Sequence, residues 1–180
     1  TNSGEAMSMG EKSPIAISNP VAAGKLALAE ALINLLPSGV SKLSDIKISA
    51  NWMASPDNAQ RKTDLFNTVK ELTQKVCNPW RIAVPVGKDS LSMKTIWQKD
   101  KKTNLSPQSL IISAFTKIKN VKKSITPQLI DSNELLLVYL DLSKTKKRLG
   151  GSILSEVTQQ TNLETPNLEC IDEFPKIYNY

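Results

Sequence analysis

The sequence has 180 residues and a formal net charge of +6, with 40% hydrophobic and 22% charged residues, which is typical of a globular protein of one or two domains. Because it contains no histidine, it offers no Ser–His or Cys–His catalytic pair and no imidazole metal site, so a metal would have to be a hard cation bound by oxygens. Cys77 and Cys170 show no CxxC spacing, which favours reduced thiols and a cytoplasmic location.

The first half of the chain predicts short strands alternating with two long helices. Residues 13–17 (SPIAI) predict a short strand. Asn19 and Pro20 then begin a helix that continues to Leu36 and ends at the PSG turn. Residues 43–53 alternate in polarity as a strand does. A second helix is expected over 61–76, ended by NPW, with one apolar face made of Leu65, Phe66, Val69, Leu72 and Val76.

Three further strands are predicted at 81–86, 91–98 and 107–118, the first two joined by a GKDS turn and the last two by a lysine-rich hairpin loop. Residues 121–133 lose the pattern and predict a linker. Residues 134–142 (ELLLVYLDL) predict a buried strand, and 148–160 (RLGGSILSEVTQQ) a Gly-rich turn that enters a helix. We therefore divide the chain into a domain over 1–120, a linker over 121–133 and the incomplete beginning of a second α/β domain over 134–180, which suggests a piece of a longer protein.

Half of the lysines lie in three clusters, KDKK at 99–102, KIKNVKK at 117–123 and KTKKR at 144–148. Each cluster lies at the end of an apolar segment, where a connection is expected, and no aromatic residues interleave with the lysines to stack on bases. Such runs are usually solvated loops, so we predict no nucleic-acid partner. The longest apolar run, LLLVYLDL, is strand-sized and the N-terminus lacks a signal-peptide pattern, so we predict no membrane association.

Glu30 and Asn34 lie one turn apart in the first predicted helix. On a helical wheel they fall off the broad apolar arc, in line with Ala23 and Ala27. Small neighbours allow another surface to approach this side of the helix. The pair is either a solvated edge with an ordinary i,i+4 contact, or a carboxylate and an amide oxygen that ligate Mg²⁺ beside nucleotide phosphates.

A second set of candidate residues is the segment Gly87, Lys88, Asp89 and Ser90. Glycine lets a backbone approach an anion, lysine supplies positive charge, serine supplies a hydroxyl, and the aspartate carboxylate suits a cation that bridges phosphates. The spacing is not that of a Walker loop, and an ordinary hairpin turn is the alternative. Asn51 follows the strand core IKISA; it is either a further ligand contact or an amide that satisfies the local backbone.

Six segments, taken together and in order, resemble a single family: GEAMSMGEKSPIA, AAGKLALAEALINL, IKISANWMASP, PVGKDSLSMKTIWQ, SPQSLIISAF and TPQL. From Gly4 to about Gly151 they are similar to phosphoribosylformylglycinamidine synthase in its large single-chain form, which carries a fused glutaminase. The resemblance implies the N-terminal half of the aminoimidazole-ribonucleotide-synthetase fold, in the second of two repeats. In that fold a mixed sheet, flanked by helices, contributes strands to a shared barrel and is followed by an α/β C-terminal half.

The resemblance also implies an activity and its site residues. The family converts formylglycinamide ribonucleotide, glutamine and ATP to formylglycinamidine ribonucleotide, glutamate, ADP and phosphate. Glu30 and Asn34 match the family's magnesium ligands. Gly87 and Ser90 match a turn that contacts ATP in smaller relatives, whereas Lys88 and Asp89 depart from that pattern.

The cofactors that the resemblance implies are Mg²⁺ and ATP or ADP. The implied partners are the rest of the parent chain and small-molecule nucleotides. A non-catalytic, structural nucleotide-binding module of the same enzyme is the alternative role. Since the family's glutaminase nucleophile and its synthetase histidine are missing, we expect the isolated chain to be inactive.

Overall fold

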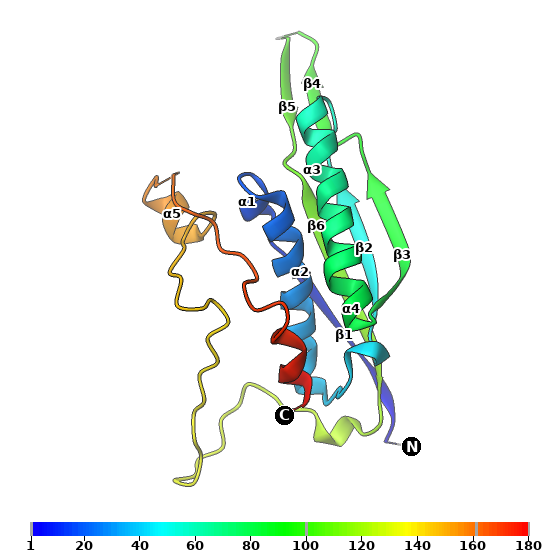
Figure 1. Cartoon of the computed structure of the whole chain (residues 1–180), viewed down its shortest axis with the longest axis vertical. Helices are drawn as coiled ribbons and strands as arrows, with labels where there is room; N and C mark the ends of the chain where they lie inside the picture. Colours follow the sequence, from blue (N-terminus) through cyan, green and yellow to red (C-terminus); the bar gives the residue numbers. More distant parts are fainter. Residues whose placement is uncertain (1, 100, 161, 180) are drawn as a thin grey trace.

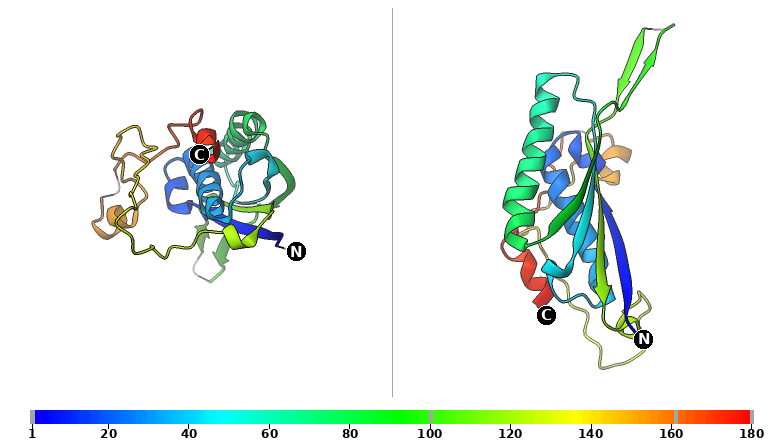
Figure 2. Two further views of the ribbon diagram at one scale, coloured as in Figure 1. Left: turned by 90° about the horizontal axis from the view of Figure 1, so that it is seen from below. Right: turned by 90° about the vertical axis from the view of Figure 1, so that its right-hand side faces the viewer.

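A four-stranded mixed sheet, covered by helices on one side, is the central feature of the fold (Figures 1 and 2). The computed structural model describes residues 2–99, 101–160 and 162–179. The strand order is β1-β6-β2-β3, with β2 and β3 parallel and the other pairs antiparallel. A separate hairpin of β4 and β5 projects from one end (Figure 1). The strands are β1 Gly4–Glu11, β2 Lys47–Met53, β3 Ala83–Ser90, β4 Lys94–Trp97, β5 Lys102–Leu105 and β6 Ser109–Ile118.

The first strand and the first helix differ from the prediction. β1 was not predicted, because the residues that it turns toward the helices are the small Ala6, Ser8 and Gly10 and give no hydrophobic alternation. Residues 13–17, predicted as a strand, contain instead the helical turn α1, Ser13–Ala16. Pro14 is in its first turn, where a missing N–H costs nothing, and Ile15 is buried against the next helix.

The central helix α2, Pro20–Leu35, confirms the first predicted helix. The Asn19 side chain caps it by accepting a hydrogen bond from the Ala22 amide at 3.0 Å. A 3₁₀ turn follows, and Gly39 then takes the left-handed conformation, φ 83°. The helix with its 3₁₀ extension, Pro20–Ser38, is the one described segment long and apolar enough to cross a bilayer, but 56% of the tested window is buried inside the fold, as in a core helix.

The second long helix is three joined pieces, α3 Ala59–Lys70, a π-helical stretch Glu71–Cys77 and α4 Asn78–Trp80. NPW therefore continues the helix rather than breaking it, and the end comes at Arg81, whose φ is 58°. The predicted apolar face is wrong at Phe66, which is 63% exposed, whereas Leu72 and Val76 are buried. Because a π-turn holds more residues than an α-turn, positions before and after residue 71 do not keep one common face.

The lysine-rich loop predicted between 91–98 and 107–118 is confirmed only as the site of a hairpin, because it contains β5, which pairs with β4, while β6 pairs with β1 and β2 instead. Asp100 of the KDKK cluster lies outside the described residues. The buried strand predicted at 134–142 is wrong. Residues 134–142 form no strand and pair with neither sheet of the described part of the chain, and the side chains of 135–140 are 55–87% exposed. The Gly-rich turn before a helix is confirmed, since Ser152 caps α5, Ile153–Val157.

The C-terminal segment packs on the helix layer of the first domain. Leu168, Phe174 and Tyr178 belong to the same buried core as α2 and β2. The ring of Phe174 stacks on Trp80 with centroids 4.9 Å apart, and the Tyr178 hydroxyl donates to the Leu32 carbonyl. The division of the chain at 121–133 remains a prediction.

The lysine cluster at 144–148 lies in a loop, as predicted, but it also pairs with glutamates of the C-terminal segment. Lys146 and Arg148 lie 3.8 and 2.7 Å from the carboxylate of Glu169. The hydrogen bond from Arg148 lowers the pKa of Glu169. These contacts tie the loop to the segment that closes the core, which gives the charges a structural role.

The backbones of β1 and α2 lie very close together in the core, and this approach depends on Gly10. A Cβ at Gly10 would lie 2.0 Å from the carbonyl oxygen of Ala27 and 2.6 Å from the amide nitrogen of Ala31. Gly10→Ala is therefore expected to force the strand off the helix and to lower the free energy of unfolding by about 3 kcal/mol. Urea denaturation measures this, with Gly87→Ala as the control, since a Cβ there meets nothing within 4 Å. Equal stabilities of the two variants would contradict the packing.

Both cysteines are free and buried, as the reduced-thiol prediction requires. Burial raises the pKa of Cys77 from its ordinary 9.0 to about 11. As the pH rises, the unfolded chain therefore loses this proton before the folded chain does. The free energy of unfolding should then fall between pH 9 and 11, by up to about 1.4 kcal/mol per pH unit. Below pH 8 the thiol is protonated in both states and should not affect stability. Urea denaturation of the chain and of Cys77→Ala across this range measures the difference in slope. Identical slopes would show that the thiol does not carry this dependence.

Candidate functional site

The predicted site residues fall into two groups at opposite edges of the sheet. Glu30 and Asn34 lie on α2 above β1, whereas Gly87–Ser90 form the end of β3. Since β6 and β2 separate these edge strands, the two groups are about 14 Å apart across the sheet at ordinary strand spacing. The structure therefore brings Asn51 and Lys88 together but does not bring them to Glu30.

Glu30 and Asn34 contact the free edge of β1. The Glu30 carboxylate accepts a hydrogen bond from the Glu11 amide at 2.8 Å, and the Asn34 side-chain amide donates to the Met9 carbonyl at 3.1 Å. Four helical residues rise about 6 Å, close to the span of about 6.6 Å between strand residues i and i+2, so the two side chains match alternate backbone groups of the strand. The surface that approaches this side of α2 is β1 itself.

Two residues beside this pair were not singled out from the sequence, Glu11 and Lys12. The Lys12 ammonium lies 2.5 Å from the Glu30 carboxylate, with both side chains about one-third exposed. Glu11 accepts a hydrogen bond from the Ser13 amide through its own carboxylate. The only signal in the sequence was the pair of charges in GEK, just before a strand that had not been recognised.

The oxygen groups at this edge suit magnesium only in part. The Asn34 amide uses its nitrogen on Met9, which leaves its oxygen for a cation, and each oxygen of Glu30 retains acceptor capacity. Among the described residues, no cluster of three or more acidic, cysteine or histidine side chains is placed to hold a metal. This edge therefore offers two oxygen ligands, and Lys12 now lies against one of them.

The GKDS segment is strand rather than turn, which corrects the prediction. Parallel pairing with β2 continues to Met53↔Ser90, so the ladder satisfies the backbone and no reversal is needed until after Ser90. Lys88 donates to the Ser90 hydroxyl. Both residues alternate with Gly87, which pairs with the buried Ala50, so their side chains lie on the side of the sheet away from the helices. Gly87 pairs with the buried Ala50 and Asp89 with Trp52.

Asn51 lies next to Lys88 in a row of residues that crosses the uncovered face of the sheet. The row is Glu11, Ile111, Asn51 and Lys88, one from each strand. The side-chain oxygen of Asn51 is buried and accepts no hydrogen bond from the described residues. The alternative in which this amide satisfies its local backbone thus fails for that oxygen, which is left buried without a partner among the described residues.

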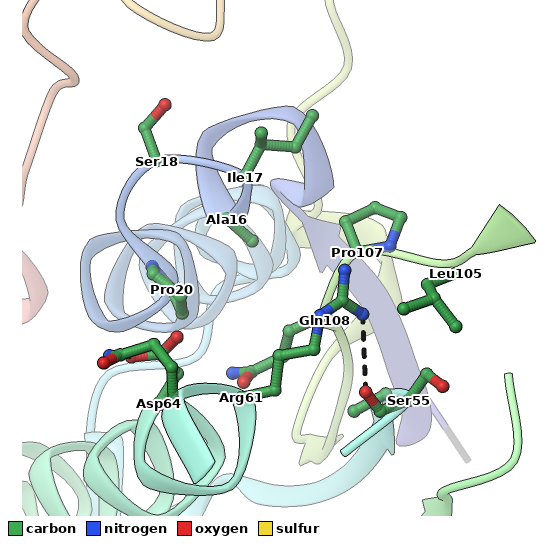
Figure 3. A pocket seen from close by; sticks show the side chains of 12 residues that line it. Ala16, Ile17, Ser18, Pro20, Ser55, Arg61, Asp64, Leu105, Pro107 and Gln108 are labelled. Carbon is green, nitrogen blue, oxygen red and sulfur yellow. Dashed lines mark hydrogen bonds between the residues drawn. The ribbon is translucent and has the colours of Figure 1, made fainter. Parts of the chain in front are cut away.

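A cavity of about 450 Å³ opens at the other end of the helix layer, between the start of α2, the start of α3 and the loop before β6 (Figure 3). Its lining includes Ser55, Arg61, Asp64 and Gln108. The Arg61 guanidinium donates to the carbonyls of Ser106 at 3.0 Å and Ser55 at 3.4 Å. Figure 3 shows this guanidinium between Ser55 and Pro107.

The mixed sheet with helices on one side defines a PurM-type N-terminal domain. The family described as FGAR-AT PurM_N-like domain matches residues 1–117, and the chain belongs to this family.

The fold is also that of solved phosphoribosylformylglycinamidine synthase II (PurL) structures from Thermotoga maritima. The enzyme at 2.15 Å resolution is 19% identical with a TM-score of 0.52, and the match covers 71% of this chain and 20% of that one. PurL complexed with FGAR is 16% identical with a TM-score of 0.55, covering 71% and 19%. PurL complexed with AMPPCP is 20% identical with a TM-score of 0.53, covering 71% and 20%. The chain thus spans about a fifth of the length of the structures it matches.

Proposed function

We propose that this chain is a nucleotide-handling part of an ATP-dependent ligase of purine biosynthesis, the N-terminal half of its second synthetase repeat. The reaction converts formylglycinamide ribonucleotide, glutamine and ATP to formylglycinamidine ribonucleotide, glutamate, ADP and phosphate. The observation that carries the proposal is the family match over residues 1–117, supported by a fold similar to that of PurL, which has been solved with FGAR and AMPPCP. The chain acts within a larger cytoplasmic enzyme, and it is inactive alone because the glutaminase lies elsewhere.

Within that ligase, Glu30 and the Asn34 oxygen would hold Mg²⁺ against nucleotide phosphates. The ion would neutralise charge on a transferred phosphoryl group. The Lys12 ammonium lies against the same Glu30 carboxylate. Once Mg²⁺ replaced it there, the ammonium would be free to pair with a phosphate oxygen of the nucleotide. Gly87, Lys88, Asp89, Ser90 and Asn51 would contact the nucleotide or its substrate from the other edge of the sheet.

A second role for the same residues is a structural nucleotide site that retains ADP and does not turn over. Glu30 also fixes the strand edge through Glu11, so a nucleotide bound there would stabilise the fold as well. The two roles separate in the full-length ligase, where Glu30→Ala should abolish turnover with ADP retained if the site is catalytic. Loss of retained ADP together with lowered stability would favour the structural role.

Glu30→Gln tests the metal site in this chain directly. With Mn²⁺ and ADP, the NMR signals of the Asn34 side-chain amide and the Glu11 backbone amide should broaden, because a bound paramagnetic ion lies beside them. The neutral glutamine keeps the acceptor for Glu11 but weakens cation binding, so the concentration for half-maximal broadening should rise at least about tenfold. Glu71→Gln is the control, a helical glutamate about one-third exposed beside Lys75. Unchanged broadening in Glu30→Gln would remove the metal role.

The uncovered face of the sheet is where we expect the rest of the parent chain to pack. Met7 and Met9 of β1 are 71% and 60% exposed, and Phe115 beside Met7 is 42% exposed. A row of large apolar side chains on one sheet face usually marks an interface. The partner proposed is the matching sheet of the other synthetase repeat. We expect neither nucleic acid nor membrane to use this face.

Phe115→Asp tests this interface. The isolated chain should self-associate through the uncovered sheet at concentrations of about 100 µM, and a charge at its centre should reduce the association at least about tenfold. Sedimentation velocity measures this, with Phe66→Asp as the control, because Phe66 is exposed on the helix side. Equal association of the two variants, or a wild-type chain that stays monomeric, would contradict the interface.

A further inference from the structure

We infer that residues 163–178 form a strap that opens and closes over the helix layer as a unit, and that ion pairs from the loop at 144–148 hold it closed. Figure 1 shows this segment, in red, running beside α2. The inference rests on the contacts of the strap and of the loop that holds it, so it does not require the proposed function.

The strap is joined to the rest of the fold mainly by side chains. Within the described residues it contains no strand, and its helical stretch belongs to the 3₁₀ helix Phe174–Asn179. A single backbone hydrogen bond links it to another described segment, from the Gly150 amide to the Glu164 carbonyl at 2.9 Å. Segments with few such bonds open at a lower free energy than core helices and strands. The strap can therefore leave without breaking the sheet or α2.

The underside of the strap is apolar. The ring of Phe174, which is 0% exposed, stacks on Trp80, and the Tyr178 hydroxyl donates to the Leu32 carbonyl of α2. Opening would expose Trp80 and this side of α2 to water, which opposes opening. The thiol of Cys170 lies in the strap and is buried with it, so its reactivity reports whether the strap is open.

The ion pairs between the loop and the strap centre on Arg148. Its guanidinium lies 2.7 Å from the carboxylate of Glu169 and 3.5 Å from that of Glu164, and its side chain is only 8% exposed. Two lysines of the loop lie 3.8 and 3.9 Å from strap carboxylates, but their side chains are more than half exposed. Exposed pairs contribute little, whereas breaking a buried pair leaves a charge uncompensated. Arg148 is therefore the lock.

The chain just after Arg148 is fixed to α1 and to the start of the strap. Gly151 takes the left-handed conformation, φ 74°, and a Cβ there would lie 3.0 Å from the backbone of Ile15 in α1. A Cβ at Gly150 would lie 2.2 Å from the Leu163 carbonyl oxygen. These close approaches anchor the loop on the helix layer, so Arg148 holds its position while the strap moves against it.

Iodoacetamide labelling of Cys170 measures the opening of the strap, with Cys77→Ala removing the other thiol. The labelling rate in native buffer, divided by the rate of the urea-unfolded chain, gives the fraction of chains in which the strap is open. We expect this fraction to exceed the globally unfolded fraction from urea denaturation at least about tenfold. Equal fractions would show that the segment opens only when the whole chain unfolds, and would overturn the proposal.

Arg148→Met separates the lock from ordinary packing, because methionine keeps an apolar stem and removes the charge. The variant should label Cys170 at least about tenfold faster, since Glu169 loses its partner. Lys176→Met is the control, an exposed lysine of the strap outside the ion pairs of the described residues, and should label at the wild-type rate.

Glu169→Gln removes the same ion pair from the strap side and should also raise the labelling rate. It provides the test of the lock if Arg148→Met does not fold. A wild-type rate of Cys170 labelling in Glu169→Gln, or equal rates in Arg148→Met and Lys176→Met, would contradict the role of Arg148.

Discussion

The close approach of β1 to α2 is the constraint on which the rest of the structure depends. Gly10 lets the strand backbone lie against the backbone of the helix at Ala27 and Ala31, and the Ser8 hydroxyl donates to the Ala31 carbonyl at 2.6 Å. Glu30 and Asn34 then satisfy the outer edge of the same strand. Since β1 pairs along its whole length with β6, this contact also sets the position of the sheet under the helices.

The sheet that results has two different faces. Toward the helices it presents buried residues such as Ile48, Ile112 and Ala114, which form one core with α2 and with the C-terminal Phe174. Away from the helices it presents methionines, Phe115 and the polar row that ends at Lys88. A single layer of helices buries only one face of the sheet. The other face is therefore left to contact another domain or a ligand.

The elements that the sequence predicted well were those whose signal is local. Two helix starts are predicted by adjacent residues, Asn19 before Pro20 and Ser152 after two glycines. Both side chains form N-terminal caps in the structure. The failures needed knowledge of what lies next in space. GKDS has the composition of a turn but is strand because β2 runs beside it, and residues 134–142 have the composition of a strand but find no partner edge. Likewise, the Gln108 side chain donates to Thr68, a contact between residues 40 apart in the sequence.

The positions of Glu30 and Asn34 in the sequence correctly indicated that another surface approaches this side of α2, but they did not show that this surface is β1. Two polar groups one turn apart beside alanines do indicate an approaching surface, and that surface is β1. Their hydrogen bonds to the strand use one acceptor position of Glu30 and only the nitrogen of Asn34, so a structural role leaves oxygen atoms available. Lys12 shows that the remaining negative charge attracts a cation at this edge. A divalent ion would have to displace an ammonium group held by one partly exposed ion pair, which costs no more than about 1 kcal/mol. Holding the strand and holding the proposed metal would therefore be compatible, because the hydrogen bonds to β1 fix both side chains and leave these oxygen atoms unused.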